Sequence, residues 1–169
     1  MRIFNETQRF DQWWIRLINT GLLVFLSFCA YKWYIANEAI GNVGSTNIIG
    51  QSVMGVSIIP ILLLFHIMRL RTQIDERGVH YQFFPFNLSY RTILWNEMEK
   101  CYIKTYNPLK EYGGWGYRSS MGKKGSAINI KGNQGIQIAF KSGKRLLIGT
   151  QKETDALKVI RRHFKAVDE

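Results

Sequence analysis

An apolar stretch with aromatic ends decides the fold of this chain: residues 13–34 read WWIRLINTGLLVFLSFCAYKWY. Its centre, from Gly21 to Tyr31, contains no charged residue. At about 1.5 Å of rise per residue, a helix of this length spans the hydrocarbon core of a bilayer, which is roughly 30 Å thick. Tryptophan and tyrosine stand at both ends, and these rings favour the membrane–water interface. The stretch therefore predicts a transmembrane helix.

A second apolar stretch of similar length covers residues 48–70 and reads IIGQSVMGVSIIPILLLFHIMRL. It predicts another transmembrane helix, which Pro60 is expected to kink. Small residues in both stretches would let the two helices approach closely, so we expect them to form the contact between the helices. They are Gly50, Gly55 and Ser57 in the second stretch and Gly21, Ser27 and Ala30 in the first.

The flanking charges predict the orientation of this helical hairpin. Arg2, Arg9 and Arg16 lie before or at the start of the first stretch, and Arg69, Arg71 and Arg77 lie at or beyond the end of the second. The connection between the stretches, residues 35–47, contains no Lys or Arg. The positive-inside rule therefore places both termini in the cytoplasm. A cleaved signal peptide is disfavoured, because the first apolar run ends in bulky aromatic residues.

The rest of the chain is polar and basic. Of the 23 Lys and Arg residues, 17 lie from Arg77 onward, and nine of the 12 Asp and Glu residues lie from Asp75 onward, so this portion carries a net charge of about +8. We predict an N-terminal segment with two transmembrane helices in residues 1–71 and one cytoplasmic domain in residues 72–169. The two cysteines, Cys29 and Cys101, fall within apolar runs and predict buried thiols, not a disulfide scaffold.

The hydrophobic pattern of residues 72–169 predicts strands followed by one helix. The predicted strands cover residues 78–83, 91–95, 99–105, 127–130, 136–140 and 145–148. Residues 150–166 predict an amphipathic helix, whose buried stripe is Ala156, Leu157, Ile160 and Phe164. The fold class is therefore a membrane helical hairpin joined to a mainly-β domain, which is a bent antiparallel sheet or barrel capped by the C-terminal helix.

Four segments carry a resemblance to a known family: Thr72-Gln73-Ile74-Asp75-Glu76-Arg77-Gly78-Val79, Ile93-Leu94-Trp95, Tyr112-Gly113-Gly114-Trp115-Gly116-Tyr117-Arg118 and Leu147-Ile148-Gly149-Thr150-Gln151. In this order they resemble a bacterial pleckstrin-homology-like (PH-like) domain behind a two-helix membrane hairpin, a largely uncharacterised family. The resemblance covers most of residues 72–166 and implies a fold and the bacterial cytoplasmic (inner) membrane. It carries no catalytic residue.

Two groups of residues are candidates for contact with a partner. In the glycine-rich loop these are Trp115, Tyr117 and Arg118, which either meet a partner or fold back onto the core; the loop's pattern favours neither. The basic candidates in predicted turns are Lys123, Lys124, Lys144 and Arg145. Each cation near anionic lipid head groups contributes on the order of 1 kcal/mol. An ordinary solvated basic surface is the favoured alternative for this second group.

Several functions find no support in the residue pattern. Residues 116–124 lack the spacing of a nucleotide-binding Walker loop, and Lys123 is followed by Lys124 where Ser or Thr is needed. His66, His80 and His163 stand in no metal-ligand spacing, and no nucleophile–base pair is evident in the sequence. No nucleic-acid-binding module is present either. We therefore expect no metal, no cofactor, no nucleic-acid partner and no enzymatic activity.

These observations predict a non-enzymatic binding or scaffolding module, anchored in the bilayer at its cytoplasmic face. Its expected partners are the bilayer itself, a protein, and possible anionic lipid head groups. An alternative is an accessory subunit of a larger membrane complex, which contacts its partners through the transmembrane helices. A membrane enzyme with an unrecognised site is the least favoured interpretation.

Overall fold

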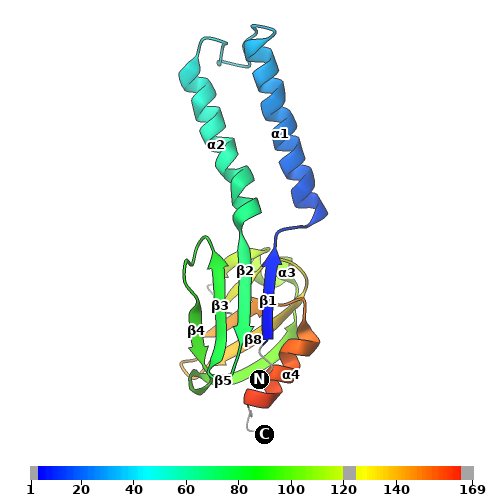
Figure 1. Cartoon of the computed structure of the whole chain (residues 1–169), viewed down its shortest axis with the longest axis vertical. Coiled ribbons are helices and arrows are strands. Elements are labelled where there is room, and N and C mark those ends of the chain that lie inside the picture. Colours follow the sequence, from blue (N-terminus) through cyan, green and yellow to red (C-terminus); the bar gives the residue numbers. More distant parts are fainter. Residues whose placement is uncertain (1–3, 120–124, 165–169) are drawn as a thin grey trace. The chain divides into compact units, whose positions relative to one another are not determined.

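The structure is a computed structural model that describes residues 4–119 and 125–164. The chain divides into two compact units. The helical unit comprises residues 10–67, and the β unit comprises the N-terminal residues up to Arg9 together with the chain from Met68 onward. Figure 1 labels the elements of both units. The basic candidates Lys123 and Lys124 lie outside the described residues.

The helical unit consists of α1 (Trp13–Tyr34) and α2 (Ile48–Ile67). Both helices are long and apolar enough to cross a membrane, as predicted. Only 11% and 6% of their most apolar windows are buried. This exposure separates them from the core helix of a soluble protein, whose apolar residues are mostly buried. α2 ends before the predicted Leu70 because the chain from Arg69 onward pairs in a sheet.

The buried residues of α1 follow a single face of the helix. They are Ile15, Asn19, Cys29 and Trp33, and Leu62 is the buried residue of α2. Trp33 also donates its indole N–H to the carbonyl of Val43 in the connecting loop, at 3.0 Å. The buried face of α1 therefore combines two large apolar side chains, Ile15 and Trp33, with the smaller Asn19 and Cys29.

The predicted contact through small residues is wrong. An added Cβ at Gly21 would meet no atom within 4 Å, and at Gly50 it would meet Val43 and Asn47 of the connecting loop. Ser27 and Ala30 of α1 are exposed. The small residues of α1 that we expected at the contact therefore lie at the surface.

The β unit contains two sheets. The first has the order β1-β2-β3-β4 and is antiparallel throughout, and the second has the order β5-β8-β9-β7-β6. The strands of the first sheet are β1 (Phe4–Arg9), β2 (Arg69–Ile74), β3 (Gly78–Phe84) and β4 (Arg91–Leu94). Those of the second are β5 (Met98–Thr105), β6 (Gly116–Ser119), β7 (Ser126–Asn129), β8 (Gln134–Phe140) and β9 (Arg145–Gly149). A 3₁₀ turn, η1 (Trp95–Glu97), joins the sheets. Each of the six predicted strands is present.

The N-terminal strand β1 alters the predicted division at residue 72. β1 pairs with β2 along its whole length, from Phe4 opposite Ile74 to Arg9 opposite Arg69. The helical hairpin is therefore an insertion between two neighbouring strands. The apolar pattern missed β1 because two of its inward-facing side chains are polar: Glu6 is 4% exposed and Gln8 is 3% exposed.

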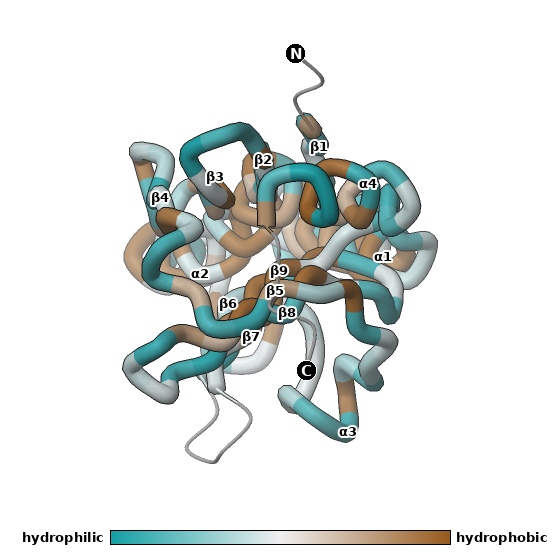
Figure 2. Tube along the Cα trace, turned by 90° about the horizontal axis from the view of Figure 1, so that it is seen from below, coloured by the Kyte–Doolittle hydropathy of each residue, from teal (hydrophilic) through white to brown (hydrophobic). Residues whose placement is uncertain are grey.

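The second sheet departs from the predicted antiparallel sheet at one pair, because β7 runs parallel to β9. Two elements that were not among the predicted ones, a short helix, α3 (Pro108–Tyr112), and strand β6, lie just before and within the glycine-rich stretch. Figure 2 shows hydrophobic residues along the strands near β5, β8 and β9 and hydrophilic residues in the connecting turns. Fully buried isoleucines of the second sheet, among them Ile136 and Ile138, belong to this core.

The C-terminal helix α4 (Glu153–His163) contacts strands of both sheets, namely β5 and β8 of the second and β1 and β2 of the first. Figure 1 shows it beside β1. Its buried residues are Ala156, Val159 and Ile160, while the predicted Leu157 is only half-buried. Phe164, just beyond the helix, packs on Trp95 with ring centroids 5.7 Å apart. The prediction of a closing helix is confirmed.

Candidate functional site

The glycine-rich loop begins with a well-capped helix. The Asn107 side-chain oxygen accepts hydrogen bonds from the backbone N–H groups of Leu109 and Lys110, at 3.1 and 3.0 Å. These bonds satisfy donors that the first turn of a helix otherwise leaves unpaired. Gly113 ends α3 with a φ of +71°, a conformation that glycine adopts without steric cost. Local sequence therefore fixes where the loop starts.

A buried hydrogen-bond network holds the next part of the loop. The backbone N–H of Gly116 donates to the Asn129 side-chain oxygen at 3.0 Å, and the Asn129 amide donates to the Tyr106 hydroxyl at 2.9 Å. Tyr106 packs edge-to-face against Tyr112, with centroids 5.9 Å apart. Burial raises the pKa of Tyr106 to about 12, so its hydroxyl stays protonated at neutral pH.

The two interpretations of the loop thus apply to different residues. Tyr112 is buried and Trp115 is half-buried, whereas Tyr117 is 52% exposed and Arg118 is exposed. The Arg118 Nε–H donates to the carbonyl of Trp115 at 3.2 Å. Tyr117 is the aromatic residue of the loop that is most available to a partner.

An open cleft of about 530 Å³ brings Tyr117 together with residues of both sheets. The first sheet contributes Tyr81 from β3 and Arg91 from β4, which face each other in the strand register. The second sheet contributes Tyr117, Lys144 and Arg145. We refer to these five residues as the basic cleft. β4 and β6, which carry Arg91 and Tyr117, are the terminal strands of their sheets.

The electrostatics of the basic cleft favour an anion. Three cationic residues and two tyrosines line it, and no Asp or Glu is among the described residues of its lining. Burial raises the pKa of Tyr81, and the neighbouring Arg91, which hydrogen-bonds to it, offsets part of that effect. Tyr81 therefore remains a neutral hydrogen-bond donor at neutral pH. Arginine, lysine and tyrosine together suit phosphate or carboxylate groups.

Only some of the predicted contact residues line the basic cleft. Tyr117, Lys144 and Arg145 line the basic cleft, but Arg118 and Trp115 do not. Tyr81 and Arg91 were missed, because in the sequence they are one residue of an alternating strand and one charge at a strand start. Only the strand register and the packing of two sheets bring them to the other three residues.

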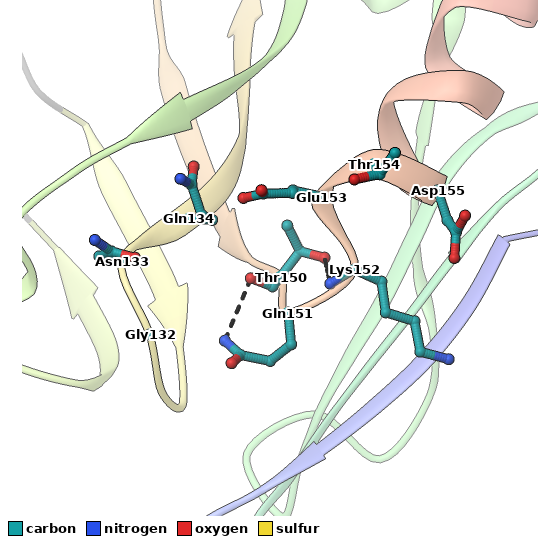
Figure 3. Close-up of a pocket in the computed structure, with 9 residues that line it drawn as sticks. All are labelled: Gly132, Asn133, Gln134, Thr150, Gln151, Lys152, Glu153, Thr154 and Asp155. Atoms are coloured by element: carbon teal, nitrogen blue, oxygen red, sulfur yellow. Dashed lines mark hydrogen bonds between the residues drawn. The ribbon is translucent and has the colours of Figure 1, made fainter.

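A second hollow, of about 410 Å³, surrounds the start of α4 (Figure 3). Polar residues from the turn before β8 and from the turn between β9 and α4 line it, and the Gln151 amide donates to the Thr150 carbonyl at 3.3 Å. Glu153 and Asp155 stand in the first turn of α4. These carboxylates already complement the helix dipole and would repel an anion. The hollow is therefore the weaker candidate.

A hydrogen-bonded chain of hydroxyl, imidazole and carboxylate crosses the first sheet. The Thr92 hydroxyl lies 2.8 Å from His80 Nδ1, and His80 Nε2 lies 3.0 Å from Asp75 Oδ1. Sequence reasoning missed this arrangement because the three residues come from different segments. Asp75 Oδ1 also accepts from the backbone N–H groups of Arg77 and Gly78. The chain thus ties the β2–β3 turn to β4, and none of its members lines the basic cleft.

Within residues 4–119 and 125–164, no group of three or more His, Cys, Asp or Glu side chains is placed to hold a metal ion. Both cysteines are buried and free. The chain matches no protein-family model and no curated protein. The basic cleft is therefore the candidate site that the geometry itself supports best.

Proposed function

We propose that this protein is a non-enzymatic binding module, anchored at the cytoplasmic face of a bacterial inner membrane. In this proposal α1 and α2 cross the bilayer, and the basic cleft receives an anionic group of a protein partner. The observation that carries the proposal is the convergence of Arg91, Lys144 and Arg145 from two sheets onto one cleft.

The insertion of the hairpin supports the membrane anchorage. Because β1 precedes α1 and β2 follows α2, the N-terminal strand and the remainder of the β unit belong to one folded body. A hairpin that crosses the bilayer twice keeps both of its ends on one side, as this body requires. The basic charge of the β unit favours the cytoplasmic side.

The architecture supports the PH-like assignment within the same proposal. Two sheets joined by η1, with a C-terminal helix that contacts both, match the expected order of elements. The parallel β7–β9 pair is the main departure from the antiparallel sheet that we expected. Since scaffolding domains bind by surface complementarity, this fold needs no catalytic group for the proposed role.

The test uses the full-length protein, purified from its native membrane with its bound partners. In one variant, Arg91→Gln, Lys144→Gln and Arg145→Gln remove three cations from the basic cleft. The matched control, Lys110→Gln, Arg161→Gln and Arg162→Gln, removes three exposed cations that lie outside the cleft. We expect partner recovery to fall in the cleft variant alone.

Salt provides a second criterion for the same proposal. The Debye length shrinks from roughly 10 Å at 0.1 M salt to about 3 Å at 1 M, so partner recovery should fall as salt rises. Equal recovery from the wild type and the cleft variant would refute the cleft as the binding site. Recovery of anionic lipid in place of a protein would refute the protein partner but keep the anion site.

A second candidate function is an accessory subunit that binds other helices within the bilayer. The specific observation in its favour is that Gly21, Ser27 and Ala30 of α1 lie outside the contact with α2. Gly21→Leu fills this open surface without touching the hairpin contact. Under this candidate the substitution abolishes co-purification of a membrane partner, whereas the cleft variant leaves it intact.

A further inference from the structure

The loop between β3 and β4 exposes an apolar surface on the β unit. It consists of residues 85–90, in which Phe86 is 61% exposed, Leu88 is 78% exposed and Tyr90 is 39% exposed. We call this segment the apolar loop. Single exposed apolar residues are common on soluble proteins, but three within five positions of one loop form a contiguous candidate for contact.

The apolar loop is held in place by the strand before it. The backbone N–H of Asn87 donates to the Phe83 carbonyl at 2.8 Å, and the Gln82 amide donates to the Leu88 carbonyl at 2.6 Å. The Phe86 ring stacks on the buried Phe83 ring, with centroids 5.4 Å apart and planes 9° apart. These contacts fix the backbone with Leu88 at the surface, so the exposure belongs to a defined conformation.

The strand register places the apolar loop at one particular end of the first sheet. Phe84, the last residue of β3, pairs with Arg69, and Arg69 pairs with Arg9. Arg69 is the second residue after the end of α2, and Arg9 stands four residues before the start of α1. Figure 1 shows the loop at the same end of the sheet as the end of β1 and the start of β2.

We propose that the apolar loop inserts into the interfacial region of the bilayer that holds α1 and α2. This inference rests on the proposed membrane anchorage. A lipid surface is the expected contact of this loop. The loop lies at the end of the first sheet where β1 leads into α1 and where α2 leads into β2. Phenylalanine and leucine bury apolar area at the boundary of head groups and acyl chains, and tyrosine keeps its hydroxyl in the polar layer.

The neighbouring charges agree with this occupant. Arg9 and Arg69 lie at this end of the first sheet. Cations beside an apolar insertion contact the phosphates of the same lipids. The loop thus provides a third attachment that orients the β unit, and with it the basic cleft, to which Arg91 belongs.

The experiment compares two labelled variants of the full-length protein in phosphatidylcholine vesicles. Leu88→Cys carries an environment-sensitive fluorophore on the apolar loop. The matched control is Leu94→Cys, an exposed leucine at the opposite end of the sheet, where it pairs with Gly78. The native Cys29 and Cys101 are buried, so the wild type gives the background of labelling. Vesicles with brominated acyl chains quench a fluorophore that contacts the lipid, so a loss of emission reports contact with lipid.

We expect the label at position 88 to shift to shorter wavelength and to lose most of its emission in brominated vesicles, while the label at 94 does neither. An unquenched, water-exposed label at 88 overturns the proposal, and so does equal quenching at 88 and 94. A label at 88 that is shielded from water but unquenched also overturns it, because protein would then cover the loop. Washing the vesicles with carbonate distinguishes the membrane anchorage from the insertion of the loop. Protein that is released by the wash contradicts the anchorage. Protein that is retained but carries an unquenched label at 88 contradicts the insertion alone.

Discussion

At the scale of single residues, buried polar groups are the most sensitive points of the β unit. Asn129 is fully buried, and it bridges the backbone of Gly116 to the hydroxyl of Tyr106. A hydrogen bond in such a place adds little to stability by itself. Its loss is costly, since the remaining partners stay buried and unpaired.

Asn129→Ala is therefore expected to lower the free energy of unfolding by about 1–3 kcal/mol, the usual cost of an unsatisfied buried group. Chemical denaturation of the full-length protein in micelles measures the change. Asn133→Ala, at an exposed position in the turn before β8, is the matched control and should have almost no effect. Equal effects of both substitutions would contradict the role of the network.

Asp75 gives the β unit a pH dependence of stability. Burial raises its pKa, but hydrogen bonds from the His80 side chain and from the backbone N–H groups of Arg77 and Gly78 outweigh burial, so the pKa is lowered. A carboxyl whose folded pKa lies below its unfolded value of about 3.8 stabilises the fold above that value. This stabilisation is lost as the pH falls through the folded pKa.

We therefore expect wild type to melt at a higher temperature than Asp75→Asn at neutral pH, with a difference that shrinks as the pH falls below about 4. Thermal melts of the two proteins across this range test the sign. A difference that is constant over the whole range would show that the ionised carboxylate contributes nothing.

At the scale of elements, β1 is joined to the other end of the chain by side-chain hydrogen bonds. Both carboxylate oxygens of Glu6 are used: Oε2 accepts from the Thr150 hydroxyl at 2.6 Å and Oε1 from the Gln151 backbone N–H at 2.8 Å. The Gln8 amide also donates to the Gly149 carbonyl at 2.7 Å. The strand before the hairpin is thus fastened to the turn between β9 and α4.

Glu6→Ala is expected to cost about 1.5–3 kcal/mol, the range for hydrogen bonds to a charged group, and to speed hydrogen exchange at the Gln151 amide. Thr7→Ala, on the exposed face of the same strand, is the matched control. Hydrogen exchange followed by mass spectrometry locates the effect. Unchanged exchange at the start of α4 would contradict the tie between β1 and this turn.

At the scale of the whole molecule, the insertion of the hairpin between β1 and β2 imposes a topology. The residues before α1 and the residues after α2 belong to one folded unit, so they must lie on one side of any membrane that the helices cross. Residues 35–47 must then lie on the other side.

In intact cells, a cysteine introduced at Thr46 in the α1–α2 connection should react with a membrane-impermeant maleimide. A cysteine at the exposed Ser142, in the turn between β8 and β9, should react only after the cells are permeabilised. Both variants should remain in the pellet after a carbonate wash. Labelling of Ser142→Cys in intact cells would refute the cytoplasmic placement, and release by the wash would refute the anchorage.

The order of amino acids alone was sufficient for the two long helices, six of the strands and the closing helix. Apolar length predicted α1 and α2, alternation predicted six strands, and helical spacing predicted α4, because each pattern reflects the local geometry of one element. Local pattern failed at β1, whose inward-facing Glu6 and Gln8 hydrogen-bond to residues more than 140 positions away. It also failed at the contact between the helices, because Gly21, Ser27 and Ala30 of α1 lie at the surface.

The basic cleft could not be predicted from local patterns, because it depends on long-range packing. Lys144 and Arg145 were evident as turn charges, and Tyr117 as an aromatic residue between glycines. Tyr81 and Arg91 line the same cleft only because β3 pairs with β4 and because residues of the first sheet lie close to those of the second sheet. A composition records which charges a chain carries, but the distance between two charges depends on strand register and sheet packing, and those arise from burial of apolar area across the whole unit.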